Sequence, residues 1–285
     1  MSITRISDIR DGNDNVLILA HRGHRLGYVA ENTMQAYDLA IALGADIIEV
    51  DVARTLDDRC VIVHGPLMET VSTLTGDVHE KRYDPDLKAI RYTSAYGLHP
   101  EMSIPTLEEV LENYRGRAVI NIDRAYTIPE LEFAYKIVER MDMLDQVLFK
   151  SPCCVEEAAL WLESHSYKAA YMPIVRNDEA EMQRILSIAK RISFPAIEIT
   201  FRNDKMSIFS QETVAEAQKL GMKPLCNTIA LLGETLCGGH DDLVSILEGA
   251  DRGWGWLIDR GARILQTDCT GEVKHYLNKR KEAST

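Results

Sequence analysis

Six side chains that can bind a metal or a phosphate ester or move its protons stand at or inside apolar runs near the start of this chain. An imidazole titrates near neutral pH, a guanidinium offers a forked donor to phosphate oxygens, and paired carboxylates bind hard cations. Strand ends present such groups from a rigid scaffold. The six residues are His21, Arg22, Glu31, Glu49, Asp51 and His64. Together they predict phosphodiester chemistry.

Glu49 and Asp51 have the spacing of two residues on one side of a strand. Alternate side chains of a strand share a face and lie about 7 Å apart along it, and these two stand in the apolar run Ile47–Val52. Burying two like charges is costly unless a cation compensates them. Mg²⁺ or Ca²⁺, which prefer oxygen ligands, is the expected partner. The alternative is a half-exposed strand on which both carboxylates face solvent.

His21 and Arg22 directly follow the apolar run at 16–20, at the point where a loop should begin. In an α/β barrel the carboxyl ends of the strands form the functional face. His21 can carry protons there, and Arg22 can hold phosphate oxygens. The alternative is a histidine that caps a strand end beside an arginine in a surface ion pair.

Composition limits the fold and the partners. The chain has 285 residues, 46% of them hydrophobic, and a formal net charge of −12. An α/β barrel spends about 250 residues on one domain, so we expect residues 1–285 to form a single barrel domain. The acidic charge and the lack of a long basic run disfavour nucleic acid. An anionic substrate then requires a metal or a local cationic pocket.

The N-terminal residues contain no apolar stretch of signal-peptide length, and no 18-residue apolar run occurs. We therefore expect a cytoplasmic protein with no stable membrane insertion. The six cysteines show no metal-ligand spacing and are expected to be reduced. A homo-oligomer is compatible with this composition.

Strand-like and helical segments alternate along the chain, which is typical of βα units around a parallel sheet. Helical periodicity marks segments such as 31–43, 129–141, 178–191 and 211–220. The strand candidates are 16–20, 46–52, 60–64, 118–123, 146–150, 168–173, 196–201, 223–227 and 263–267. A barrel needs only eight of these nine runs. We predict an α/β fold, a TIM-type (β/α)8 barrel with a loop insertion at about 66–109.

The run at 60–64 is the candidate for the extra strand. The turn at 56–59 predicts that it folds back on 47–54 as a hairpin. In an antiparallel hairpin the residue numbers of opposite partners add to a constant. A turn centred on residues 57 and 58 makes this sum about 115, which places His64 opposite Asp51. A slip of one residue would turn each side chain to the other face.

Ordered motifs in the first 64 residues resemble the glycerophosphodiester phosphodiesterase family of the phospholipase-C-like barrels. They are His21-Arg22-Gly23, Glu31-Asn32-Thr33, Gly44 to Val52, Thr55-x-Asp57 and Val61-x-Val63-His64, with weaker echoes at 103–109 and 261–268. The resemblance implies one divalent metal, a TIM-type barrel and a role for each matched residue. Glu49 and Asp51 would be metal ligands. The other implied roles are an acid/base pair of His21 and His64, a phosphate clamp at Arg22, and a position near the site for Glu31.

Three departures from the family pattern concern the metal and the substrate. The chain has Asp123-Arg124 where the family usually has Glu-x-Lys, so Asp123 would be a shorter third ligand. Lys150, at the end of the next strand-like run, can supply the missing cation to the phosphate, or else it faces solvent. Gly65 follows His64 where an aspartate is usual.

The third departure is Leu225–Thr228, which stands where the family often has a tryptophan in the pocket wall. A more polar wall follows from this change. Glu198 and Asn227 can then hydrogen-bond substrate hydroxyls, although a structural role is an equal alternative.

The expected reaction is hydrolysis of a small, soluble phosphodiester to an alcohol and a phosphomonoester. A glycerophosphodiester is the default substrate, and the polar wall leaves open a sugar phosphodiester, including an agrocinopine-type opine from opine catabolism. The alternative is a non-catalytic barrel that binds a phosphate ligand. The two histidines argue against it, because simple binding needs no acid/base pair.

Overall fold

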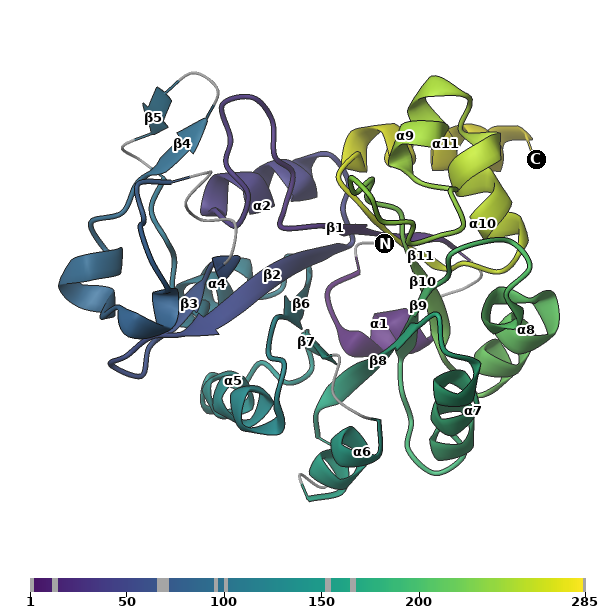
Figure 1. The fold of residues 1–285 in the computed structure, drawn as a ribbon, viewed down its shortest axis with the longest axis horizontal. Helices are drawn as coiled ribbons and strands as arrows, with labels where there is room; N and C mark the ends of the chain where they lie inside the picture. Colours follow the sequence, from purple (N-terminus) through teal and green to yellow (C-terminus); the bar gives the residue numbers. More distant parts are fainter. Residues whose placement is uncertain are drawn as a thin grey trace.

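Eight parallel strands close into a barrel in the computed structural model, which describes residues 3–11, 15–65, 72–94, 97–99, 102–151, 155–164 and 168–283. In order around the barrel they are β1 (Leu17–Ala20), β2 (Ile47–Arg54), β6 (Val119–Asp123), β7 (Val147–Ser151), β8 (Ala170–Arg176), β9 (Ala196–Thr200), β10 (Lys223–Asn227) and β11 (Ile264–Thr267). Because β1 pairs with both β11 and β2, the ring is closed (Figure 1). The predicted (β/α)8 fold is confirmed.

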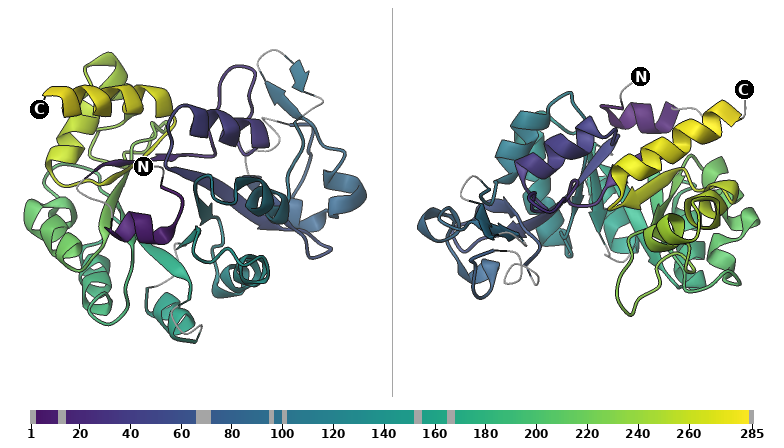
Figure 2. Two further views of the ribbon diagram at one scale, coloured as in Figure 1. Left: turned by 180° about the vertical axis from the view of Figure 1, so that it is seen from behind. Right: turned by 90° about the horizontal axis from the view of Figure 1, so that it is seen from above.

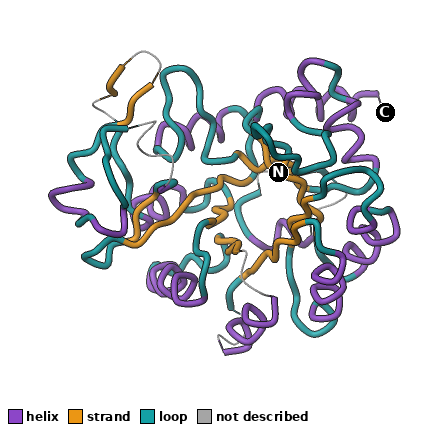
Figure 3. Tube along the Cα trace, viewed as in Figure 1, coloured by secondary structure: helices purple, strands orange, loops and turns teal. Residues whose placement is uncertain are grey.

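Helices surround the strands, as the tube view makes plain (Figure 3). They are α2 (Met34–Ala42), α4 (Leu107–Tyr114), α5 (Ile128–Arg140), α6 (Val155–Ser164), α7 (Glu179–Ile188), α8 (Gln211–Lys219), α9 (Asp242–Leu247), α10 (Trp256–Asp259) and α11 (Thr270–Ala283). Thr106 and Thr127 start α4 and α5 with capping boxes, in which each threonine and a glutamate three residues later satisfy free backbone N–H groups. The apolar faces of these helices and the outward side chains of the strands make the main core.

A short N-terminal helix, α1 (Ile6–Asp11), closes one end of the barrel. Its Ile6 and Ile9 pack against inward side chains of the strands, among them Leu19, Leu148 and Ile264. Figure 2 shows α1 lying across the barrel opening in its left view. Sequence periodicity did not predict this helix, because six residues are too few to show a helical period. The apolar plug leaves the carboxyl ends of the strands as the accessible end.

Inward side chains change from apolar to polar along each strand. Strand side chains alternate between two faces, so residues two apart point into the barrel together. On β9, Ala196 joins the apolar plug, and Glu198 and Thr200 line a cavity above it. On β7 the same step leads from Leu148 to Lys150. The barrel therefore has a dry end at α1 and a polar end where the strands finish.

The ninth strand run forms β3 (Cys60–Ile62), antiparallel to β2, and confirms the predicted hairpin. The predicted register is wrong by one residue. Val52 pairs with Ile62, and the N–H of Val63 donates to the carbonyl of Asp51 at 2.8 Å. His64 lies beyond the end of β3 and still reaches the cavity that Asp51 lines, because the paired strand stops before the histidine.

The chain between β3 and α4 extends to one side of the barrel (Figure 1). It contains a 3-10 helix at Val78–Glu80, a π-helical turn at Tyr83–Leu87, and the hairpin β4 (Tyr92–Ser94) and β5 (Gly97–His99). Its apolar side chains form a separate small cluster, which also includes Val63, the residue after β3. Residues 66–71, 95, 96, 100 and 101 lie outside the described residues. A single domain over 1–285 with an insertion at about 66–109 stays a prediction.

Among the described residues, no helix has the length and apolar character needed to span a bilayer. Four cysteines are free thiols, of which Cys60, Cys226 and Cys237 are buried. Cys153 and Cys154 lie outside the described residues.

Candidate active site

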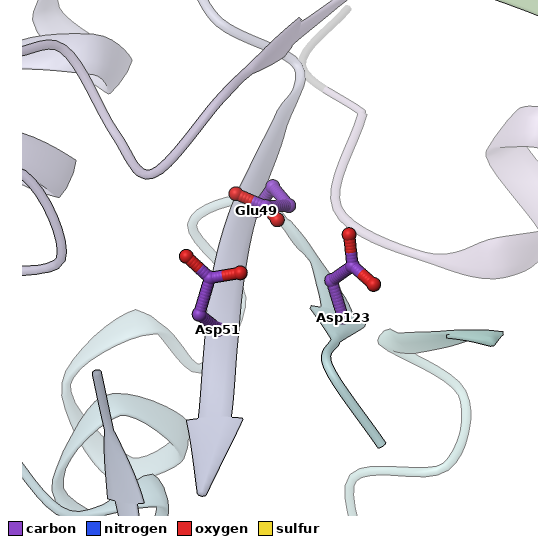
Figure 4. A group of neighbouring side chains, drawn as sticks. All are labelled: Glu49, Asp51 and Asp123. Carbon is purple, nitrogen blue, oxygen red and sulfur yellow. The ribbon is translucent and has the colours of Figure 1, made fainter. Parts of the chain in front are cut away.

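Three carboxylates meet at the polar end of the barrel. Glu49 and Asp51 extend from β2, and Asp123 ends the adjacent strand β6, where it is the register partner of Asp51. One oxygen from each of the three lies within 4.8 Å of the others. Figure 4 shows the three side chains on their neighbouring strands. Glu49 and Asp51 are each only 1% exposed, so the alternative in which both face solvent is wrong.

The cluster suits a divalent cation. Burial and the charge of Asp51 raise the pKa of Glu49 to about 8, which shows that a third negative charge is costly at this position. Although burial alone would raise it, Lys150 lowers the pKa of Asp123 to about 2. A bound cation would relieve the repulsion at Glu49, and three carboxylate oxygens are ligands that hard cations prefer. The donor set therefore fits a metal ion.

Arg22 binds the acidic cluster from the turn after β1. Its Nε lies 3.0 Å from Asp51 Oδ2, and its backbone N–H donates to Glu49 Oε2 at 2.7 Å. A terminal nitrogen of the same guanidinium pairs with Glu31 at 2.7 Å. Arg22 is buried, so the alternative of a surface ion pair is wrong. Glu31 does not line the cavity; it lies behind Arg22 and fixes its orientation.

The tight turn after β1 depends on Gly23. Its φ is +77°, and a Cβ added there would lie 2.7 Å from the backbone carbon of Ala36 in α2. Thr33 caps α2 by accepting from the N–H of Ala36, and Asn32, at a φ of +56°, donates to Asp51 Oδ2 at 2.8 Å. The close approach of turn and helix thus sets the positions of Arg22 and Asp51 together.

His21 is oriented by a carboxylate from the far end of the sequence. Its Nδ1 lies 2.9 Å from Oδ1 of Asp268, the residue that follows β11. Burial by itself would lower the pKa of His21, but the hydrogen bond to Asp268 and the charges of Glu49 and Asp268 raise it above its usual value. Arg25 donates to the other oxygen of Asp268 at 3.0 Å. A protonated His21 is therefore stabilised.

His64 has the opposite environment. Both of its ring nitrogens are buried, and neither has a hydrogen-bond partner among the described residues. Burial, reinforced by the charges of Arg22 and Arg124 and opposed by Asp51, lowers the pKa of His64 to about 4. The pKa values of the two histidines that line the cavity are thus shifted in opposite directions, towards the cation for His21 and towards the neutral ring for His64.

Lys150 is the centre of a second charged group. It is 1% exposed, so it does not face solvent, and its Nζ lies 2.8 Å from Asp123 and 3.1 Å from Glu198. The Gln266 side chain accepts a further hydrogen bond at 3.2 Å. Asn227 donates to Glu198 at a long 3.4 Å. Lys150 therefore connects Asp123 on β6 with Glu198 on β9 through two ion pairs.

A cavity of about 950 Å³ opens above these groups. It is lined by nine of the ten residues that the sequence singled out, the exception being Glu31; the nine are His21, Arg22, Glu49, Asp51, His64, Asp123, Lys150, Glu198 and Asn227. A second hollow of about 470 Å³ adjoins it at Arg124 and Tyr126.

Three polar residues of the site did not emerge from the sequence as contributors. Asp268 orients His21, Gln266 accepts from Lys150, and Arg124 lies 3.3 Å from Asp51 through its Nε. Asp268 and Gln266 belong to the end of β11, the strand that pairs with β1. Closure of the barrel could have indicated Asp268 and Gln266, because it places the last strand beside β1, the strand that His21 follows.

The fold and the site define an α/β barrel with a buried carboxylate cluster, suited to a divalent cation, in a cavity that two histidines also line. A family model described as the glycerophosphoryl diester phosphodiesterase family matches residues 21–191, which is more than half of the chain. The chain belongs to this family. A second model, described as a domain of unknown function, matches residues 171–277.

Curated relatives match part of the chain. A glycerophosphodiester phosphodiesterase of Bacillus altitudinis is 35% identical over 140 residues, which is 47% of this chain and 57% of the relative. A glycerophosphodiester phosphodiesterase of Bacillus subtilis (strain 168) is 31% identical over 129 residues, 41% of this chain and 43% of the relative. The matched regions thus span about half the length of these relatives.

Solved structures share the fold over nearly the whole chain. A glycerophosphoryl diester phosphodiesterase from Parabacteroides distasonis superposes with a TM-score of 0.79 at 19% identity, covering 98% of this chain and 94% of that one. An Oleispira antarctica phosphodiesterase in complex with the product sn-glycerol-3-phosphate gives 0.64 at 16% identity, covering 92% and 96%. These likenesses support the barrel fold.

Proposed function

We propose that this protein hydrolyses a small phosphodiester to an alcohol and a phosphomonoester with the help of a divalent metal. The observation that carries the proposal is the buried cluster of Glu49, Asp51 and Asp123 in one cavity with two histidines of opposite protonation tendency. Family membership and the names of the curated relatives support the same reaction class. A protein that only binds a phosphate ligand would not need two histidines with opposite pKa shifts in its cavity.

The three carboxylates would hold Mg²⁺ or Ca²⁺, both of which favour oxygen ligands. When bound, such a cation supplies positive charge that polarises the phosphoryl group and offsets charge in the transition state. Arg22 would clamp a phosphate oxygen, since a guanidinium has five N–H donors and its contacts to Asp51 and Glu31 leave others for a ligand. The phosphate is thereby held against the floor formed by β2 and β6.

The histidines would move the protons. His64, whose neutral ring is favoured, accepts the proton of the attacking hydroxyl, which comes from water or from a neighbouring substrate hydroxyl. His21 is held at Nδ1 by Asp268, so Nε2 is the atom that donates a proton to the departing alkoxide. The new bond joins the attacking oxygen to phosphorus, and the bond from phosphorus to the alcohol oxygen breaks. With water as the nucleophile, this step gives the phosphomonoester directly. With a substrate hydroxyl it gives a cyclic phosphodiester, and in a second step water attacks phosphorus and the ring P–O bond breaks, with His21 now the base and His64 the acid. Two groups whose pKa values are shifted apart suit these two tasks.

A glycerophosphodiester is the proposed substrate class, and a sugar phosphodiester, including one of the agrocinopine type, is the finer alternative. Glu198 and Asn227 line the cavity and offer polar atoms to substrate hydroxyls. Lys150 would act on the phosphate only indirectly, because it is already paired with Asp123 and Glu198.

The test is phosphomonoester release from a panel of glycerophosphodiesters and sugar phosphodiesters. Metal-stripped protein is assayed first, and Mg²⁺ or Ca²⁺ is then restored. We expect turnover only when the metal is present. The substrate that is cleaved with the highest kcat/KM identifies the alcohol group that the enzyme prefers. If the reloaded protein binds the metal but cleaves no ester of the panel, the binding-barrel alternative replaces the proposal.

A further inference from the structure

Two arginines line the cavity without an acidic partner. Arg176 ends β8, and Arg202 lies two residues beyond the end of β9. Both are exposed and both line the 950 Å³ cavity. In the part of the chain that the structure describes, neither guanidinium forms an ion pair with a carboxylate. The other cavity arginines, Arg22 and Arg124, are both paired with Asp51.

Strand register directs both arginines towards the barrel axis. On β8 the inward residues are Met172, which joins the apolar plug, and Ile174, which lines the cavity, so Arg176 is the next inward position. On β9 the same alternation runs through Glu198 and Thr200 to residue 202. Because β8 and β9 are neighbours, the two guanidinium groups come from adjacent strand ends.

Arg176 and Arg202 stand across the barrel mouth from the proposed chemistry. Going around the ring, β8 is four strands from β1, and β9 is four strands from β2. In an eight-stranded ring these pairs are diametrically opposed. A phosphodiester with its phosphate at the carboxylate cluster on β2 and β6 would therefore extend one of its alcohol groups towards Arg176 and Arg202.

The wall around the two arginines also offers groups for a polar ligand. The side-chain oxygen of Asn177 is buried and has no hydrogen-bond partner among the described residues. Glu234 is the acidic side chain of this wall, and Glu198 below it is paired with Lys150. Among the described residues that line this wall, the two guanidinium groups thus face one carboxylate without an ion pair, that of Glu234, in a protein whose net charge is −12.

We propose that Arg176 and Arg202 select a phosphodiester whose alcohol carries a second anionic group, either a carboxylate or a phosphate. The inference rests on the proposed function, because it needs the phosphodiester phosphate at the carboxylate cluster. Guanidinium groups bind carboxylate and phosphate oxygens through paired, charge-assisted hydrogen bonds. Asn177 can accept a hydrogen bond from an ammonium or hydroxyl group on the same alcohol.

Glycerophosphoserine and glycerophosphoethanolamine make a matched test, since they differ only by one carboxylate. The wild-type metal-loaded protein should have a kcat/KM roughly tenfold higher for the serine ester, the size expected of hydrogen bonds to a charged group. Glycerophosphoglycerol with and without a terminal phosphate provides the phosphate arm. A preference in one arm alone identifies which anion is recognised.

Arg176→Gln, Arg202→Gln and the double variant should bring the serine-to-ethanolamine ratio towards one, mainly through KM for the serine ester. Arg5→Gln, at the opposite end of the barrel, is the matched control for loss of one surface charge and should keep the ratio. A ratio of one in the wild type, or a preference that the double variant retains, overturns the inference.

Calorimetric titration of O-phosphoserine against phosphoethanolamine makes the same comparison without turnover. Loss of catalysis on all esters with a retained arginine-dependent preference for O-phosphoserine would reject the proposed function and keep the anion site. Equal affinities for the two ligands, together with equal kinetics, would reject the anion site alone.

Discussion

The two sides of the barrel mouth are built differently. On the side of β1, β2 and β6, most functional groups are fixed by partners, as Asp51 is by Arg22, Asn32 and Arg124. His64 is the exception, since its buried ring nitrogens have no hydrogen-bond partner among the described residues. On the side of β8 and β9, Arg176 and Arg202 are exposed and carry no ion pair among the described residues. Groups that must hold a reaction geometry need fixed partners, whereas groups that choose a substrate need free ones. We interpret the first side as chemistry and the second as selection.

The largest effect should come from the histidines of the first side. His21→Ala and His64→Ala should each lower kcat by roughly 100-fold or more, because each removes a group that we propose as general acid or base. Metal affinity should stay the same, as measured by titration of the stripped variants. His275→Ala, an exposed position on α11, is the control. Unchanged turnover in both site variants would remove the acid/base assignment.

Asp123→Asn should weaken metal binding by roughly tenfold or more, since it replaces the charge of a proposed ligand by a neutral amide. It also removes the 2.8 Å ion pair with Lys150 and leaves that lysine with Glu198. Equilibrium dialysis with Mg²⁺ and Ca²⁺ measures the change. Asp38→Asn, on the outer surface, should bind metal as the wild type does. If the Asp123→Asn variant binds the metal as tightly as the wild type, Asp123 is not a metal ligand.

Asp268→Asn should lower turnover by about tenfold, because His21 loses the partner that orients it and favours its protonated form. Since the hydrogen bond to Asp268 raises the pKa of His21, its loss lowers that pKa. If His21 must be protonated to act as the acid, the alkaline limb of the kcat profile moves to lower pH.

The control for this profile is Asp204→Asn, which removes a similar histidine partner, 3.0 Å from His240, outside the cavity. It should leave both limbs in place. A shift of the alkaline limb to higher pH in Asp268→Asn would reverse the proposed proton roles.

Asn227→Ala should have the smallest effect, a change of a few fold in KM, because the Asn227 side chain donates to Glu198 and accepts from the N–H of Ile229, both at a long 3.4 Å. Steady-state kinetics on several esters measures it, and Asn113→Ala on the surface of α4 is the comparison. A loss as large as that of His21→Ala would break the division of the mouth into a reacting side and a selecting side.

Local sequence predicted much of the first side. Glu49 and Asp51 were identifiable because period-2 alternation puts them on one face of an apolar run, and their ligand geometry then follows from pairing with β6. The hairpin register was off by one because turn residues alone do not specify where pairing stops. The contribution of Glu31 is indirect, through Arg22, and sequence alone does not separate a cavity residue from one that supports it.

Arg176 on the second side and Asp268 on the first escaped prediction for different reasons. The apolar run 168–173 ends at a proline, whereas β8 continues for three residues beyond it to Arg176. Contacts between distant segments were also invisible, because no motif connects His21 with Asp268. Both became evident only when the order of strands around the ring was known.

Closure of the ring between β1 and β11 has a consequence for biogenesis. His21 emerges from the ribosome well before Asp268, the residue that aligns its ring. A chain that has not yet paired β11 with β1 has all three carboxylates and both histidines, and still lacks an aligned proton donor. Completion of the barrel and the onset of catalytic competence should therefore coincide during synthesis.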